Sequence, residues 1–358
     1  MTGFAYASAL GRLKPQFPAF LPKEFYSTLT GAKDLNEITK LLEGTAYGPE
    51  IARAASQYKG APLLEVAINR AFVHRNRTAY ESAPFAGRGV VGAYLKRWDT
   101  QNIGLILSSK ALGRSVTEAE LFLVSSREIP AGLFAGAMTI DDFRLLLQQP
   151  TLDAVAQNLV RFGYGSVLLP LMEAYGRTHD IFPLLLALDR DYYARLLETS
   201  RFYQGDEWTV RLFIQSEIDV RNALLVLKGK AGGLPVDVVQ ERFLPGGTLP
   251  ASAVPELYSA RAVPELVQAL EPRFPTLSEG NPLYAADHSL TGFEAELLRD
   301  RAVRELKRLK SYPLSLSVIF TYLLISELER TDLRRIIYGK VYNFDPNTVA
   351  GLLVVPRI

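Results

Sequence analysis

A polar triplet with fixed spacing occurs three times in the chain. Each copy has an acidic residue, an asparagine or aspartate three positions later, and a lysine eleven positions after the acid. In a helix these three positions point to nearby directions, so each triplet predicts a polar stripe along a helix. The copies are Asp99, Asn102 and Lys110; Asp219, Asn222 and Lys230; and Glu329, Asp332 and Lys340.

These stripes suit contact with a partner better than catalysis. An active site needs one convergent set of groups, whereas here the set is repeated and its middle residue changes from asparagine to aspartate in the third copy. We therefore treat the three triplets, together with Arg334 and Arg335, as candidate partner contacts. The alternative is a stripe that faces solvent or a neighbouring helix, with the lysine near a helix C-terminus, where the helix dipole favours a cation.

Residues for other chemistry are scarce. The chain has no cysteine, and its histidines, His74, His179 and His288, lie more than 100 residues apart. Neither disulfides nor a local pair of metal ligands can form, so we expect no metal and no cofactor. An enzyme with a histidine- or carboxylate-based site assembled by the fold remains an alternative, and it would require a pocket of convergent groups with perturbed pKa values.

One segment matches the glycine spacing of a nucleotide-binding motif but lacks its structural context. Gly87-Arg-Gly89-Val-Val-Gly92 fits G-x-G-x-x-G. A dinucleotide site needs a strand before the glycines and a helix after them, and residues 77–84 do not form a buried strand pattern. We expect a flexible turn before a helix and no bound dinucleotide.

Composition excludes further classes of protein. The 358 residues carry a net charge of only +2, which argues against a strongly basic nucleic-acid binder. A hydrophobic content of 48% excludes a disordered chain. The charge is uneven, because residues 299–340 hold ten Lys and Arg against five Asp and Glu. This basic segment faces either solvent or an anionic partner such as acidic protein, lipid headgroups or nucleic acid.

Hydrophobic periodicity predicts an all-α fold. Residues 293–309 place apolar side chains on one stripe with a period of 3.6 residues, and Leu35, Ile38 and Leu42 follow the same spacing. The most apolar stretch, Ser311 to Ser326, is too short to span a membrane, so we expect a buried core helix there. No signal peptide is evident at the N-terminus, and we expect membrane association only through partners.

The spacing of landmarks predicts three related modules. The acids of the triplets are 120 and 110 residues apart, and Ile68, Leu188 and Leu298 each precede their acid by 31 residues. Proline-containing segments, Ile129-Pro130 and Leu244-Pro245-Gly-Gly, recur at the expected boundaries. The sequence thus predicts three homologous helical modules at about 1–128, 129–243 and 244–358.

An ordered set of motifs resembles a known family. It comprises Tyr6 and Arg12, Trp98-Asp99-x-x-Asn102, Glu217-x-Asp219-x-x-Asn222, the Leu-Pro-Gly-Gly boundary, and Glu327-x-Glu329-x-x-x-Leu333-Arg-x-Ile336-x-x-Gly339-Lys340. Together they resemble the C subunit of archaeal and bacterial V-type (A-type) ATPases, the counterpart of the d subunit of eukaryotic V-ATPases. The resemblance covers about residues 5–355.

The resemblance implies a fold and a role. Members of that family are all-helical, pseudo-threefold and funnel-shaped, and they lack catalytic activity. They lie at the cytoplasmic face of the membrane on the ring of proteolipid subunits, where they receive the central shaft. The family offers no catalytic residue to assign, and a generic helical-repeat scaffold for soluble partners is the alternative function.

Overall fold

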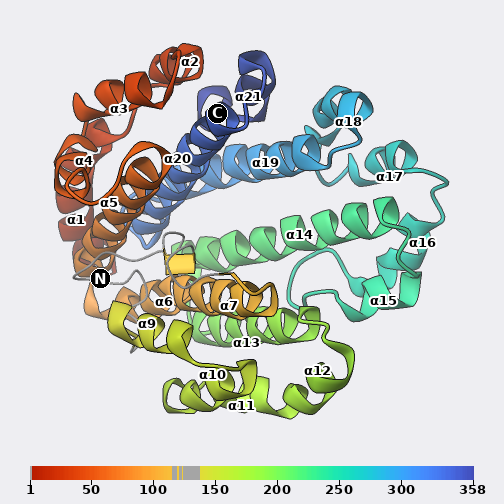
Figure 1. The fold of residues 1–358 in the computed structure, drawn as a ribbon. Coiled ribbons are helices and arrows are strands. Elements are labelled where there is room, and N and C mark those ends of the chain that lie inside the picture. The colour runs from red at the N-terminus through yellow and green to blue at the C-terminus, as the bar shows by residue number, and fades with distance from the viewer. Residues whose placement is uncertain (1, 115–118, 121–122, 124–137) are drawn as a thin grey trace. The chain divides into compact units, whose positions relative to one another are not determined.

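The computed structural model describes residues 2–114, 119–120, 123 and 138–358. These residues form helices and turns, and no strand occurs among them (Figure 1). The prediction of an all-α fold is confirmed. The predicted boundary at 128/129, with Ile129 and Pro130, lies outside the described residues, so the three-module division stays a prediction.

The chain divides into two compact units, and the first contains residues 3–15 and 42–201. Within it α13 packs against both α6 and α7, and α5 packs against α4 and α6. A hydrophobic core joins Ile103, Ile106 and Leu107 of α7 to α9, α10 and α13. The helices are α1 (Thr2–Leu13), α4 (Gly48–Ala54), α5 (Gly60–Ser82), α6 (Phe85–Leu95), α7 (Arg97–Ala111), α9 (Ile140–Gln148), α10 (Leu152–Asn158), α11 (Gly165–Leu168), α12 (Met172–Thr178) and α13 (Phe182–Ser200).

The second unit contains residues 16–41 and 202–358. Here α19 packs against α14 and α20, while α2 packs against α21, so the early segment joins the C-terminal part of the chain. A second core joins α14 to α15, α17 and α19. The helices are α2 (Lys23–Gly31), α3 (Leu35–Glu43, which ends in the first unit), α14 (Trp208–Ala231), α15 (Val236–Glu241), α16 (Val254–Tyr258), α17 (Val263–Leu270), α18 (Asn281–Asp287), α19 (Thr291–Lys310), α20 (Ser317–Val341) and α21 (Pro346–Leu352).

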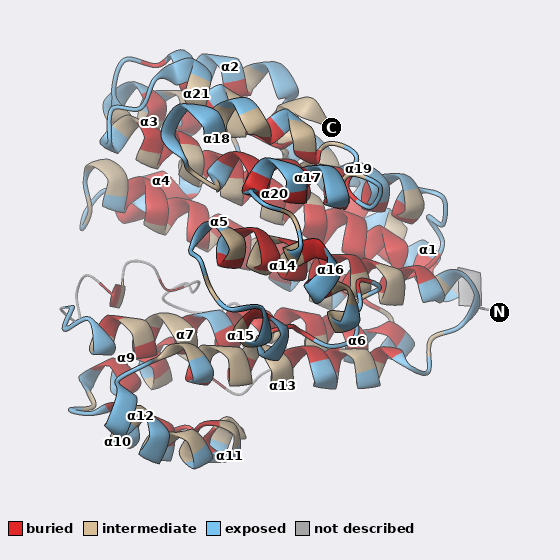
Figure 2. Ribbon diagram, turned by 90° about the vertical axis from the view of Figure 1, so that its right-hand side faces the viewer, coloured by how far each residue is buried: buried red, intermediate tan, exposed pale blue. Residues whose placement is uncertain are grey.

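The long helices α5, α14 and α20 bury more of their residues than the short helices do. Residues along α5, α14 and α20 are mostly buried, whereas α15 and α16 bury only one or two residues each (Figure 2). The predicted stripe on residues 293–309 lies on α19, with Phe293, Leu297, Ala302, Leu306 and Leu309 buried. Each long helix is therefore held by its packing rather than by its intrinsic helix propensity.

The helices that carry the three triplets, α7, α14 and α20, end in the same way. Each is followed by a residue in the left-handed region, Gly113, Gly233 or Asn343, with φ of 64°, 66° and 54°. The next N–H bonds back to a carbonyl oxygen five residues earlier at 2.8–2.9 Å in all three. This bond pattern satisfies the last carbonyls of a helix. Residues 102–110, 222–230 and 332–340 also follow nearly the same order of buried and half-buried positions, which supports the three-module prediction.

Two local expectations were wrong. Gly87, Gly89 and Gly92 lie inside α6 rather than in a flexible turn, because the helix begins directly after Pro84 and buries Gly87 and Gly92. The expected core helix over 311–326 begins only at Ser317, and residues 312–314 are exposed before it. Pro313 interrupts helical hydrogen bonding at this point.

Candidate partner contacts

The structure places the three predicted polar stripes on helices, and mainly in the interior. The acid and the following asparagine or aspartate are buried in every copy, while the three lysines are half-buried. The triplets lie one on each of α7, α14 and α20. Their role in binding another protein stays a prediction, and the hydrogen bonds of the second and third copies within the chain satisfy their buried polar groups.

The middle residue of the triplet binds the backbone 22 positions later. Asn222 donates to the carbonyl oxygen of Leu244 and accepts from the N–H of the same residue, both at 2.9 Å. Asp332 instead accepts from the N–H groups of Val354 and Val355 at 2.8 and 2.7 Å. Both side chains thereby fix the segment that follows the next short helix.

The acids of the second and third triplets also bind backbone. The Asp219 carboxylate accepts from the N–H of Leu249 at 2.8 Å and from the hydroxyl of Thr248. Glu329 accepts from the N–H of Leu21 at 2.7 Å and from the Tyr26 hydroxyl at 3.3 Å. Leu249 and Leu21 each precede a proline. The two acids therefore hold equivalent Leu-Pro segments, one of them near the N-terminus.

Asp99 differs from these two acids. It is 0% exposed, and neither carboxylate oxygen has a hydrogen-bond partner among the described residues. Burial raises the pKa of Asp99 to about 7, against the opposing effect of the nearby Lys96 ammonium. A carboxyl in this environment takes up a proton near neutral pH.

The lysines bind carbonyl oxygens at the ends of short helices. Lys110 donates to Leu147 and Gln149 at the end of α9, and Lys230 donates to Tyr258 at the end of α16 at 3.0 Å. A cation stabilises the negative end of a helix dipole. The described residues offer no hydrogen-bond partner to the third lysine, Lys340.

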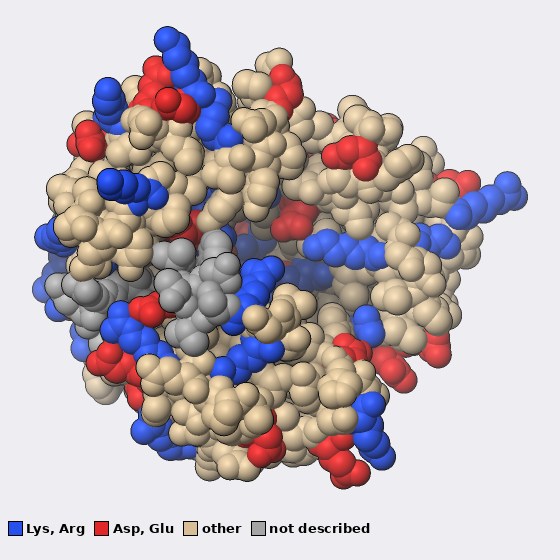
Figure 3. Space-filling view, in the orientation of Figure 1, with Lys and Arg blue, Asp and Glu red and all other residues tan. Residues whose placement is uncertain are grey.

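Five of the ten basic side chains of residues 299–340 form ion pairs within the described chain. Arg301 forms a buried ion pair with Glu217, with a nitrogen–oxygen distance of 3.0 Å. Its guanidinium also lies over the ring of Phe213. Four other arginines of the segment pair with carboxylates, and Arg335 also donates to the carbonyl of Leu352 at 2.8 Å. Figure 3 shows positive and negative side chains interspersed on the viewed face. The four are Arg299 with Glu279 and Glu296, Arg304 with Asp300, Arg308 with Glu305, and Arg335 with Asp332.

Sequence reasoning missed the buried Arg301–Glu217 pair and the close packing at Gly229 and Gly339. These glycines lie inside their helices, two residues before the last, and an added Cβ would approach Val239 at 2.6 Å and Val349 at 2.5 Å. The equal 110-residue spacing of Gly229 to Gly339 and of Val239 to Val349 was the signal that could have revealed this contact.

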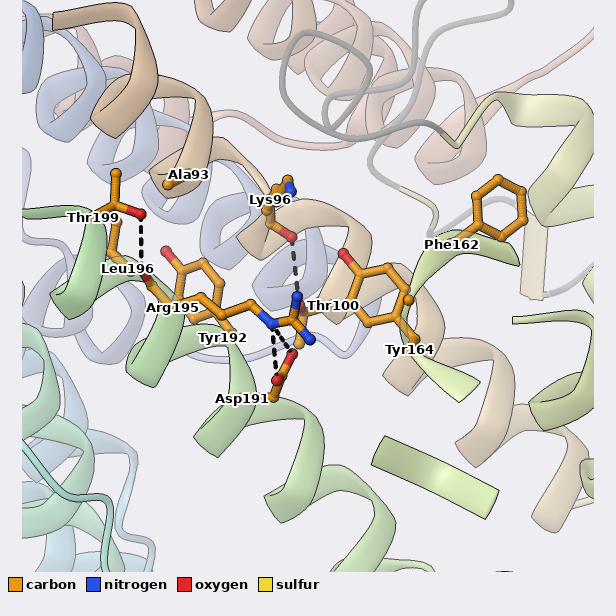
Figure 4. Close-up of a pocket in the computed structure, with 11 residues that line it drawn as sticks. Ala93, Lys96, Thr100, Phe162, Tyr164, Asp191, Tyr192, Arg195, Leu196 and Thr199 are labelled. Atoms are coloured by element: carbon orange, nitrogen blue, oxygen red, sulfur yellow. Dashed lines mark hydrogen bonds and ion pairs between the residues drawn. The ribbon is translucent and has the colours of Figure 1, made fainter. Parts of the chain in front are cut away.

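One pocket of about 230 Å³ lies within the first unit. Its lining comes from α6, α7, α13 and residues 162–164, and Figure 4 shows the Arg195 guanidinium directed at Asp191, with Tyr164 and Tyr192 on either side in this view. Arg195 and Asp191 form two contacts of 2.8 Å. The described lining combines this ion pair with the hydroxyl groups of Thr100, Tyr164, Tyr192 and Thr199, and it includes no His, Cys or Ser.

The described part of the chain carries neither a metal-binding cluster nor a membrane span. It includes no group of three or more His, Cys, Asp or Glu arranged to hold a metal ion. None of the described helices has the length and apolar character that crossing a bilayer requires.

Exposed apolar side chains mark other surfaces. In the second unit Val341, Tyr342 and Phe344 are exposed where α20 ends, and a second set lies at the start of α14 and α20. Thr209 and Ser317 hydroxyls, 2.8 Å apart, bring these two helix starts together. Exposed groups of this kind mark contact surfaces more often than single scattered side chains do. The second set is Phe202, Trp208, Tyr312 and Leu314.

Comparison with known proteins identifies the family. Residues 11–352 match the family described as ATP synthase (C/AC39) subunit. The chain belongs to this family. The C subunit of the A-type ATP synthase of Thermoplasma volcanium is 34% identical to it, and that of Thermoplasma acidophilum 33%, each over 98% of both chains. The corresponding A-type ATP synthase protein of Haloferax volcanii is 30% identical over 89% of both.

Membership of the ATP synthase (C/AC39) subunit family confirms the resemblance drawn from the motifs. The match spans all three triplets and nearly the whole chain. The protein is therefore an ATP synthase subunit, and its buried triplets lie within the region that defines the family.

Proposed function

We propose that this chain is the non-catalytic central-stalk subunit of a V/A-type ATP synthase. In this role it is a socket that joins the central shaft to the membrane ring of proteolipid subunits and couples rotation to ATP-linked H⁺ or Na⁺ transport. Family membership over residues 11–352 is the observation that carries the proposal. We place the protein at the cytoplasmic face of the membrane, attached through the ring.

The described side chains are consistent with a mechanical part. The second and third triplets fasten helices within the chain through buried hydrogen bonds to backbone, as Asn222 does at Leu244 and Asp332 at Val354. Buried polar groups with all their hydrogen bonds made give rigidity and a unique packing. A rotor coupling needs such rigidity, since a compliant joint would dissipate rotation as internal motion.

Purification from membranes tests the proposal. A tagged chain extracted in mild detergent should recover both central-shaft and proteolipid subunits, and the isolated chain should not hydrolyse ATP. Recovery of neither kind of subunit would contradict the stalk role and favour a scaffold for soluble partners. ATP hydrolysis by the pure chain would contradict its non-catalytic assignment.

A functional measurement completes the test. Membranes that lack this protein should hydrolyse ATP without pumping ions, and adding back the chain should restore pumping. Unchanged pumping in its absence would exclude a coupling role.

A further inference from the structure

The pocket in the first unit carries two cationic side chains whose hydrogen-bonding capacity is largely unused. Arg195 donates from Nε to both carboxylate oxygens of Asp191 at 2.8 Å, and its two terminal nitrogens have no partner among the described residues. The Lys96 ammonium forms neither a hydrogen bond nor an ion pair with any described residue. Arginine offers five N–H donors and lysine three, so most of these donors are left for a ligand.

Donor groups reach the pocket from three parts of the first unit (Figure 4). Lys96 directly precedes α7 and Thr100 lies in its first turn, while Arg195 lies on α13 and Tyr164 directly before α11. Burial, with a smaller contribution from the nearby Asp99 carboxyl, raises the pKa of Tyr164, so its hydroxyl keeps its proton and can donate. Donors on several sides suit a tetrahedral oxyanion better than a planar carboxylate, because its oxygens point in different directions.

Charge and size narrow the class of ligand. The lining holds the cations Lys96 and Arg195 against one acid, Asp191. Burial raises the pKa of Asp99, which lies near Lys96, to about 7, so this carboxyl does not carry a full negative charge at pH 7. The volume of about 230 Å³ is below the range of about 300–1,000 Å³ that is usual for pockets of drug-sized ligands. The pocket therefore suits a small anion.

The second unit provides an internal comparison, because α14 and α19 pack together there as α7 and α13 do in the first unit. Arg301 is 3% exposed and donates to Glu217 and Ser216, and Glu305 is paired with Arg308. Packing of such a helix pair thus does not require unpaired cations, and those of the first unit are available to a ligand. By the 120- and 110-residue spacings of the repeats, the equivalent positions are Ser216 for Lys96, Arg301 for Asp191 and Glu305 for Arg195.

We propose that this pocket binds phosphate, either as the inorganic ion or as a small phosphate monoester, with Lys96 and Arg195 donating to the phosphate oxygens. The arginine fork matches the geometry of phosphate, and lysine adds a compact positive charge. Asp191 holds the guanidinium through Nε, which leaves both terminal nitrogens for the ligand. The inference concerns the first unit alone and does not rest on the proposed function.

Titration calorimetry tests the pocket. We would titrate inorganic phosphate and glycerol 3-phosphate onto the purified full chain and onto Arg195→Gln and Lys96→Gln at constant ionic strength. The matched control is Arg77→Gln, because Arg77 also donates from Nε to an acid four residues away, Glu81 at 2.7 Å, and lies outside the pocket. We expect one phosphate per chain, with an affinity about tenfold lower in each pocket variant through loss of a charge-assisted hydrogen bond, and no change in the control.

A comparison of anions on the unaltered chain gives a second readout, which does not depend on how the variants fold. Tighter binding of inorganic phosphate would support the free ion as the ligand, and tighter binding of glycerol 3-phosphate would support a phosphate ester. Absence of binding by both, equally tight binding of acetate, or an equal loss in Arg77→Gln would overturn the inference. None of these results bears on the proposed function, which is tested by recovery of shaft and proteolipid subunits.

Discussion

Asn222 and Asp332 occupy equivalent positions but differ in type, and their backbone partners explain the difference. The segment held by Asn222 is Leu244-Pro245, and proline has no N–H, so one donor and one acceptor are available on Leu244. An amide matches that pair. The segment held by Asp332 presents two N–H groups, and a carboxylate oxygen accepts both. The aspartate in place of asparagine in the third triplet therefore matches the backbone groups that this side chain binds.

Replacing Asn222 with aspartate tests this explanation. An ionised carboxylate would place an oxygen against the Leu244 carbonyl, so we expect Asn222→Asp to lower the free energy of unfolding by about 2–4 kcal/mol at pH 8. A protonated carboxyl can donate as the amide does, so the loss should shrink at pH 5. Chemical unfolding at both pH values measures it, and an equal loss at both would contradict the explanation.

Asp99 gives a second prediction at the residue scale. Its pKa is raised to about 7, so the folded chain holds a proton that the unfolded chain releases near pH 4. The stability from this group is complete below pH 4 and is lost as the pH rises through 7, a change of about 4 kcal/mol at most.

The isosteric variant Asp99→Asn isolates that contribution. We expect it to unfold at a similar denaturant concentration to the unaltered chain at pH 4 and at a higher one at pH 8. Measuring the difference between the two proteins cancels the titration of all other groups. A difference that does not change with pH would show that Asp99 stays ionised in the fold.

At the scale of elements, two long helices depend on a glycine for close packing against short ones. Gly339 of α20 lies against Val349 of α21, and Gly229 of α14 lies against Val239 of α15 and Tyr258 of α16. The absence of a Cβ lets each short helix approach the long one. The left-handed residue that ends each long helix lies four positions later, so helix termination and close approach are separate tasks.

Gly339→Ala should therefore destabilise the fold, and Gly89→Ala should not. The Cβ at 339 would clash with Val349, which costs about 1–3 kcal/mol, while position 89 has nothing within 4 Å in the exposed part of α6. Alanine there should gain about 0.5–1 kcal/mol from helix propensity. Thermal unfolding of both variants measures the contrast, and equal shifts would refute the packing argument.

At the scale of the whole molecule, contacts between distant parts of the sequence complete the second unit. In the second unit Glu329 of α20 holds the Leu21-Pro22 segment, as Asp219 of α14 holds Leu249-Pro250. Residues 16–41 thereby join the C-terminal part of the chain. Asp219 and Glu329 thus both bind the backbone of a Leu-Pro segment, and the segment that Glu329 binds lies more than 300 residues away in the sequence.

For the candidate partner contacts, the positions followed from the sequence and the burial from the tertiary structure. Spacing alone located the triplets, since their 120- and 110-residue separations are visible in the sequence. It did not reveal that Asp99, Asp219 and Glu329 are buried, because the same 0, 3, 11 spacing describes a solvent-facing stripe and an interior one equally well. Burial depends on which helix covers the stripe, and that is a property of tertiary packing.

The amino-acid sequence by itself determined the all-α class, the repeated landmarks and the family, because helical periodicity and motif order are local or one-dimensional properties. The tertiary structure alone decided that residues 16–41 join the second unit, that five of the ten basic side chains of residues 299–340 pair with carboxylates, and that Tyr342 and Phe344 are exposed. These depend on contacts between residues far apart in the chain, which no local pattern specifies.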